Sequence, residues 1–72
     1  MIRNYRFVTA NILNVRASPS RQSEIMDELP FGQVVKIVLK KRNWCYIEYT
    51  HPEDSEISNG WVFTRYLRPF QQ

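Results

Sequence analysis

The chain has 72 residues, 43% of them hydrophobic and 24% charged, with a formal net charge of +3. This length allows one domain with a small core, because folding at this size buries only about 60% of the unfolded surface, and it leaves no room for a separate catalytic domain. The single cysteine, Cys45, excludes an intramolecular disulfide and a cysteine-based metal cluster. No apolar run approaches the roughly 20 residues of a membrane span.

The first part of the chain predicts an extended segment, a strand and a loop. Residues 5–10 are rich in β-forming side chains and predict the extended segment. In residues 13–16 the side chains alternate, so we expect Leu13 and Val15 on the buried face of a strand. Residues 17–23 contain a proline and three serines, which favour a loop.

Two further strands follow, separated by a tight turn. Residues 24–29 have imperfect alternation, which a bulge near residues 26–27 reconciles. Residues 30–32, Pro-Phe-Gly, are typical of a tight turn. Residues 33–40 predict a central strand with one apolar face made by Val35, Ile37 and Leu39.

The second half predicts two more hairpin strands and a short end. The polar residues 41–43 connect the central strand to residues 44–50, whose inward face is Cys45, Ile47 and Tyr49. Residues 51–59 predict a long acidic hairpin loop, closed by the turn signal Asn59-Gly60. Residues 60–64 predict a short strand, followed by one helical turn at 65–67 and an extended piece at 68–70.

These segments predict an all-β fold, a small closed barrel of five or six strands, because closure covers the strand edges that so short a chain has no other means to protect. The whole of residues 1–72 forms this one domain. The expected core residues are Val15, Ile25, Val35, Ile37, Ile47, Val62 and Leu67.

Five short motifs, taken in order, resemble the bacterial Src homology 3 (SH3b) family: residues 13–20, 29–32, 43–44, 60–62 and 65–67. The resemblance covers about residues 8–70. It implies an SH3-like barrel that acts as a non-catalytic binding module. Members of this family are often attached to cell-wall hydrolases or envelope proteins, where they bind peptidoglycan or peptides.

Candidates for chemistry are few. Cys45 and His51 are the only residues that could form a Cys-His pair, but Cys45 is expected to point into the core, where a thiol is inert. The acidic residues Glu53, Asp54 and Glu56 do not have the spacing of a known metal-binding loop, so a solvated loop is the simpler interpretation. We therefore predict no enzyme activity, no cofactor and no metal site.

The aromatic residues are the best candidates for a binding site. Two tryptophans, four tyrosines and four phenylalanines exceed what a small core holds, so several must lie at the surface. The resemblance implies a shallow aromatic groove, which by motif position would be lined by Trp44, Phe63 and Tyr66, with a contribution from Trp61. The alternative is that these rings only cap the core.

The charges near this groove predict which ligand it prefers. Arg16 precedes the first long loop and Arg21 lies within it, Lys41 lies on the hairpin tip, and the first carboxylate after the loop is Glu24. The topology places the acidic residues 53–56 at the opposite end of the barrel. We therefore predict that a neutral or acidic peptide binds better than an arginine-anchored proline-rich one.

The partner and the cell compartment stay open at this point. The start of the chain lacks a signal peptide, so a complete chain would be cytoplasmic, an adaptor or inhibitor that binds one protein partner. A fragment of an envelope protein would instead bind peptidoglycan. Nucleic-acid binding is a weaker third interpretation that predicts steep salt dependence, through Arg3, Arg6, Arg65, Arg68 and residues 40–42.

Overall fold

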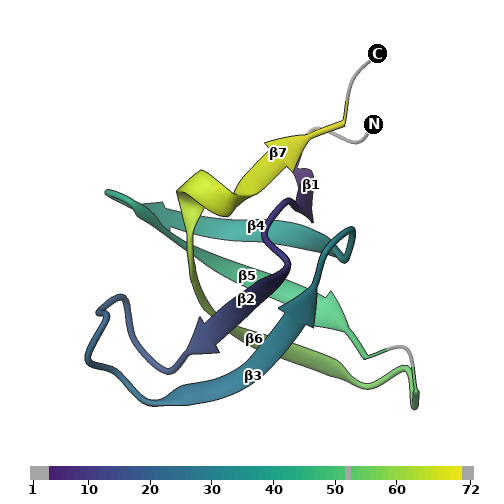
Figure 1. The fold of residues 1–72 in the computed structure, drawn as a ribbon, viewed down its shortest axis with the longest axis horizontal. Coiled ribbons are helices and arrows are strands. Elements are labelled where there is room, and N and C mark those ends of the chain that lie inside the picture. The colour runs from purple at the N-terminus through teal and green to yellow at the C-terminus, as the bar shows by residue number, and fades with distance from the viewer. Residues whose placement is uncertain (1–3, 52, 71–72) are drawn as a thin grey trace.

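The computed structural model describes residues 4–51 and 53–70, which form seven strands, one 3₁₀ turn and no α-helix (Figure 1). In chain order the elements are β1 (Tyr5–Val8), β2 (Ile12–Arg16), β3 (Ile25–Pro30), β4 (Val34–Lys41), β5 (Trp44–Thr50), β6 (Ile57–Phe63), the 3₁₀ turn η1 (Thr64–Tyr66) and β7 (Leu67–Pro69). No helix in this part of the chain is long and apolar enough to cross a membrane.

The strands form one antiparallel sheet in the order β3-β2-β6-β5-β4-β1-β7. Strand β2 joins β6 at the pair Arg16–Trp61, and the hairpin β2–β3 crosses over the layer of β5 and β6 (Figure 1). There are seven strands rather than five or six because the short segments β1 and β7 pair with each other, Val8 opposite Leu67. The seven-stranded sheet is curved, and its inner face encloses the hydrophobic core.

One hydrophobic cluster fills the inside of this curled sheet. Every strand contributes to it, which gives the small SH3-like β fold that the sequence predicts. Ile37 packs against the cluster from its rim, and Cys45 is buried as expected, with 2% of its surface exposed. The buried residues are Val8, Leu13, Val15, Leu29, Val35, Cys45, Ile47, Tyr49, Val62 and Leu67.

Two bulges change which residues of β3 and β4 face inward, compared with the prediction from the sequence. The expected bulge in β3 leaves Met26 without a partner, so Ile25 pairs with Arg16 on the outer face and is 47% exposed; its prediction as a core residue was wrong. In β4 the register shifts between Ile37 and Leu39, which turns Leu39 outward with 54% of its surface exposed. One extra residue reverses the face of every residue beyond it.

The expected turn at Asn59-Gly60 is also wrong, because β6 begins at Ile57 and both residues are paired with β5. Glycine is needed at position 60 for a different reason. A Cβ atom there would lie 2.2 Å from Cγ1 of Val15, so only glycine lets β2 approach β6 so closely. The loop between β5 and β6 is therefore shorter than the predicted residues 51–59.

Candidate functional site

Four aromatic side chains form a block on the outer face of β5 and β6. Because neighbouring residues of a strand point to opposite faces, the burial of Cys45 turns Trp44 and Tyr46 outward. Their cross-strand partners are Phe63 and Trp61. The rings of Trp44 and Phe63 stack with centroids 4.2 Å apart, and those of Tyr46 and Trp61 are 5.2 Å apart. We call these four residues the aromatic block; all are partly buried.

The 3₁₀ turn η1 extends this block with a fifth ring. The backbone N–H of Thr64 donates to the carbonyl oxygen of Asn43 at 2.8 Å, which fixes η1 beside the β4–β5 turn. Tyr66 then meets Phe63 edge to face, with ring centroids 6.4 Å apart. The structure thus brings together Trp44, Phe63 and Tyr66, the rings expected to line the groove, and adds Tyr46, which the sequence reasoning did not single out.

The three cations predicted for the groove each lie beside one of these rings. The Arg21 guanidinium carbon is 5.3 Å from the centre of the Phe63 ring. Direct cross-strand pairs place Arg16 beside Trp61 and Lys41 beside Trp44 on the same face of the sheet.

The first long loop is held in place by its own hydrogen bonds. The Arg16 guanidinium donates to the Ser23 carbonyl at 2.8 Å, and the Ser18 backbone N–H donates to the Ser23 hydroxyl at 2.8 Å. The N–H of Ala17 closes the loop on the carbonyl of Glu24. The serines that predict a loop thus also position Arg21 over its ring.

A pocket of about 540 Å³ lies next to the aromatic block, between the loop of Arg21, the β4–β5 turn and η1. We call it the cationic pocket, because its lining contains four cations and no carboxylate. Of the predicted site residues only Arg21, Phe63 and Tyr66 line it. The sequence reasoning did not assign its other lining residues to the groove: Lys40, Arg42, Asn43, Thr64 and Arg65. Three of these, Lys40, Arg42 and Arg65, were named only as cations for nucleic acid.

The register explains why this pocket was hard to predict. The β4 bulge reverses the alternation, so that Lys40 pairs with the buried Cys45 and lies at the pocket, while Lys41 pairs with Trp44 on the outer face. Arg42 occupies the left-handed region with φ of 58° in the tight turn that follows. The bulge leaves little trace in the sequence, because the residues at the register shift, Ile37, Val38 and Leu39, are all apolar.

The acidic residues lie at the other end of the β5–β6 hairpin. Its ladder runs from the pair Trp44–Phe63 to the pair Thr50–Ile57, a length of about 20 Å at the usual rise of a strand. Glu53, Asp54 and Glu56 lie beyond that far end. This distance exceeds the screening length of about 8 Å in physiological salt, so the acidic loop and the cationic pocket act on different ligand groups.

Close to the acidic loop, the carboxylate of Asp27 already has hydrogen-bond partners within the chain. Asp27 accepts a 2.8 Å hydrogen bond from the Tyr49 hydroxyl, and its Oδ2 is 3.3 Å from Nε2 of His51. Its other oxygen accepts the backbone N–H of Glu28. Burial, and then the hydrogen bond and charge of Asp27, raise the pKa of Tyr49 well above its usual value.

This cluster does not have the geometry of a catalytic relay. His51 uses the same atom, Nε2, to face Asp27 at 3.3 Å and the Ser58 hydroxyl at 3.0 Å, whereas a relay needs the two ring nitrogens for the two partners. The thiol of Cys45 contacts the Thr64 hydroxyl, at the end of β5 opposite to His51. No three His, Cys, Asp or Glu side chains of residues 4–51 and 53–70 are grouped to hold a metal ion.

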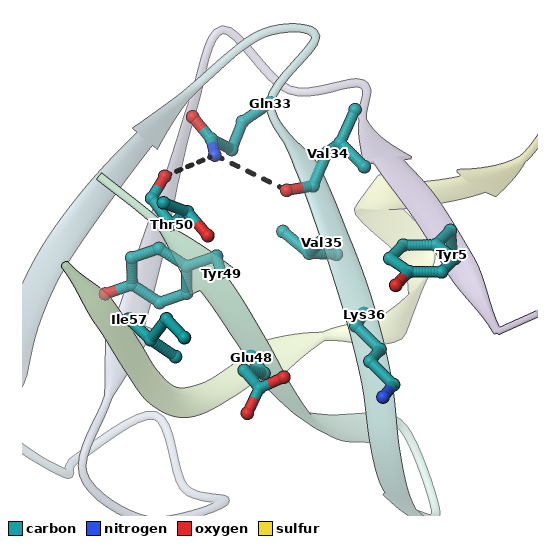
Figure 2. A pocket seen from close by; sticks show the side chains of 9 residues that line it. All are labelled: Tyr5, Gln33, Val34, Val35, Lys36, Glu48, Tyr49, Thr50 and Ile57. Atoms are coloured by element: carbon teal, nitrogen blue, oxygen red, sulfur yellow. Dashed lines mark hydrogen bonds between the residues drawn. The ribbon is translucent and has the colours of Figure 1, made fainter. Parts of the chain in front are cut away.

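A second hollow, of about 300 Å³, opens where β4 and β5 diverge beyond the pair Lys36–Glu48 (Figure 2). The amide nitrogen of Gln33 donates across the gap to the carbonyl oxygens of Val34 and Thr50. The hollow carries one charge of each sign, and its amide donors are occupied within the chain. We therefore interpret this hollow as a gap between β4 and β5 that the Gln33 side chain bridges, and not as a ligand site.

Comparison with known protein families agrees with this geometry. The bacterial SH3 domain family matches residues 11–68, nearly the whole chain. The chain belongs to the bacterial SH3 domain family. Searches of curated proteins and of solved structures found no match. Bacterial SH3 domains are binding modules, and this SH3 domain brings rings and cations together in the aromatic block and the cationic pocket.

Proposed function

We propose that this bacterial SH3 domain is a non-catalytic module that binds an extended, neutral or acidic peptide of a protein partner. The surface is made by the aromatic block and the cationic pocket. The observation that carries the proposal is the placement of a cation beside each of three rings: Arg16 with Trp61, Arg21 with Phe63, and Lys41 with Trp44.

Rings and cations contribute differently to such binding. The partly exposed aromatic side chains of the block give an extended peptide a rigid apolar support at little cost in side-chain entropy. The charges then select among peptides, because like charges at an interface are repelled. Since the lining of the cationic pocket holds no carboxylate, a ligand arginine meets only repulsion there.

Two settings suit this chemistry. In the first, the domain is an intracellular adaptor or inhibitor that docks on one protein. In the second, it targets an envelope protein or hydrolase to the cell wall, since a peptidoglycan peptide is also extended and carries carboxylates. Family membership supports the second setting, and the cationic lining of the pocket is compatible with both.

Nucleic acid is a less favoured ligand for this surface. Binding of single strands relies on open ring faces on which bases stack. Here Trp44 and Phe63 stack on each other, and Arg21 lies over Phe63. Of the cations proposed for that interpretation, Arg3 lies outside the described residues.

The test compares two versions of one proline-rich peptide, flanked by glutamate or by arginine, titrated while tryptophan fluorescence is followed. The glutamate version is expected to bind several-fold more tightly, and Trp44→Ala to abolish its binding. Tyr5→Ala, which removes an exposed ring far from the pocket, is the matched control and leaves the affinity unchanged. Tighter binding of the arginine version, lost on Trp44→Ala, contradicts the charge preference.

Two further arms separate the settings. Co-sedimentation with purified peptidoglycan that is lost on Trp44→Ala identifies the wall as the ligand. An oligonucleotide titrated at low and at physiological salt tests nucleic acid, for which affinity falls steeply with salt. Salt-dependent oligonucleotide binding stronger than that of either peptide overturns the proposal.

A further inference from the structure

Two arginines of the cationic pocket lie over neighbouring aromatic rings. Arg21 lies over Phe63, and the guanidinium carbon of Arg65 is 5.4 Å from the centre of the Tyr66 ring. The two rings are themselves in edge-to-face contact, with centroids 6.4 Å apart. Both arginines line the same pocket. The rings therefore orient two guanidinium groups at one place.

Within residues 4–51 and 53–70 neither arginine is paired with a carboxylate. The one contact there between a basic side chain and a carboxylate at this range is that of His51 with Asp27, at the other end of the β5–β6 hairpin. The planar guanidinium group can stack on a ring with its face while its N–H groups point outward at the edge. Within residues 4–51 and 53–70 neither guanidinium group donates a hydrogen bond, so the donors of Arg21 and Arg65 are left for a ligand.

This arrangement selects a particular chemical group. A carboxylate or phosphate group presents two oxygens at the spacing of the guanidinium fork and accepts two parallel hydrogen bonds from it. A lysine ammonium carries the same charge but neither the fork nor the stacking face. If the pocket used charge alone, arginine and lysine would serve it equally well.

We propose that Arg21 and Arg65 hold an oxyanion group of the bound ligand, the carboxylate of an acidic residue or a phosphate group, by bidentate hydrogen bonds from the guanidinium groups that lie over Phe63 and Tyr66. This inference rests on the proposed function, because it concerns the same surface. It adds that the forks of these two arginines, rather than the net positive charge, determine specificity. Lys40 and Arg42 contribute only long-range attraction.

The experiment replaces arginine with lysine, which keeps the positive charge but removes the forked guanidinium group. Arg21→Lys and Arg65→Lys are titrated with the glutamate-flanked peptide, and each is expected to weaken binding about tenfold. Arg68→Lys is the matched control, because Arg68 is an exposed arginine that does not line the pocket. All three residues are exposed, so circular dichroism and thermal unfolding of the variants are expected to match the original chain.

The outcomes separate this inference from the proposed function. If both lysine variants bind within twofold of the original chain while Trp44→Ala abolishes binding, the function stands and the inference is overturned. If no peptide binds the original chain, both are overturned.

The source of the oxyanion is resolved by three peptides of one sequence, with glutamate, phosphoserine or glutamine at the central position. A gain over the glutamine peptide that is lost in both lysine variants supports the inference, and the peptide that shows it identifies a carboxylate or a phosphate. Equal affinity for all three overturns the inference.

Discussion

The two ends of the β5–β6 hairpin carry opposite charges and differ in how far those charges are already paired. At the acidic end, Asp27 faces His51 and accepts hydrogen bonds from the hydroxyl of Tyr49 and the backbone of Glu28. At the cationic end, Arg21 and Arg65 lie over rings, and the pocket that they line contains no carboxylate. The first arrangement uses its charge to hold strands together. The second has no carboxylate among the residues that line its pocket.

This contrast shows why composition alone is a poor guide to a site. The net charge of +3 is modest, and the acidic cluster is as prominent in the sequence as the basic one. A charged group is available for binding only where the fold has not already given it a partner. The following substitutions test that difference, from the largest expected effect to the smallest.

Gly60→Ala is expected to destabilise the whole fold, and with it both ends of the β5–β6 hairpin. The new Cβ would lie 2.2 Å from Cγ1 of Val15, a fully buried side chain that has no room to move, so the hairpin β2–β3 would be pushed away from β6. We expect a loss of about 3 kcal/mol in the free energy of unfolding, measured by urea denaturation.

Two controls accompany this substitution. Gly32→Ala introduces no contact within 4 Å but places alanine at φ of +88°, and should cost only about 1 kcal/mol. Adding Val15→Ala to Gly60→Ala should cost less than the sum of the two single substitutions, because the steric clash disappears. Strict additivity would show that the close approach of β2 to β6 is not what requires glycine.

Tyr49→Phe is expected to affect the acidic end alone. It removes the hydrogen bond to Asp27 and should lower the free energy of unfolding by about 1 kcal/mol at neutral pH, with peptide affinity unchanged. The exposed Tyr5→Phe is the control and should leave stability unchanged. A loss of peptide affinity in Tyr49→Phe would show that the two ends are coupled.

The same hydroxyl makes stability depend on pH in the alkaline range. The folded pKa of Tyr49 lies above the unfolded value of 10.0, so the folded chain keeps a proton that the unfolded chain loses. The raised pKa of Tyr49 therefore contributes to the free energy of unfolding in full below pH 10. Above pH 10 this contribution decreases by about 1.4 kcal/mol per pH unit. Urea denaturation between pH 9 and pH 11 should show this decrease in the original chain and a shallower one in Tyr49→Phe.

Much of the fold followed from the sequence because alternation and turn residues act locally. The strand faces of β2 and β5, the loop after Arg16 and the turn at Gly32 were confirmed for that reason. Ile25 was misplaced because its face depends on the partner strand: the predicted bulge at Met26 already implies that Ile25 points outward. Local signals do not report such cross-strand register.

The site was only partly predictable for the same physical reason. The rings Trp44, Phe63 and Tyr66 come together as the motif positions imply, since strand and turn geometry bring them there. Arg65 and Lys40 were missed as pocket residues because η1 and the β4 bulge determine where they lie. Which ligand these residues bind stays a prediction.

The central claim is that the cationic end binds and the acidic end does not, and neutralising each end in turn tests it most directly. The glutamate-flanked peptide is titrated into Arg21→Gln with Arg65→Gln, and separately into Glu53→Gln with Glu56→Gln. We predict that affinity falls at least about tenfold in the first variant and stays within about twofold in the second, since the acidic loop is more than a screening length away. A larger effect of the glutamate substitutions than of the arginine ones would contradict the account.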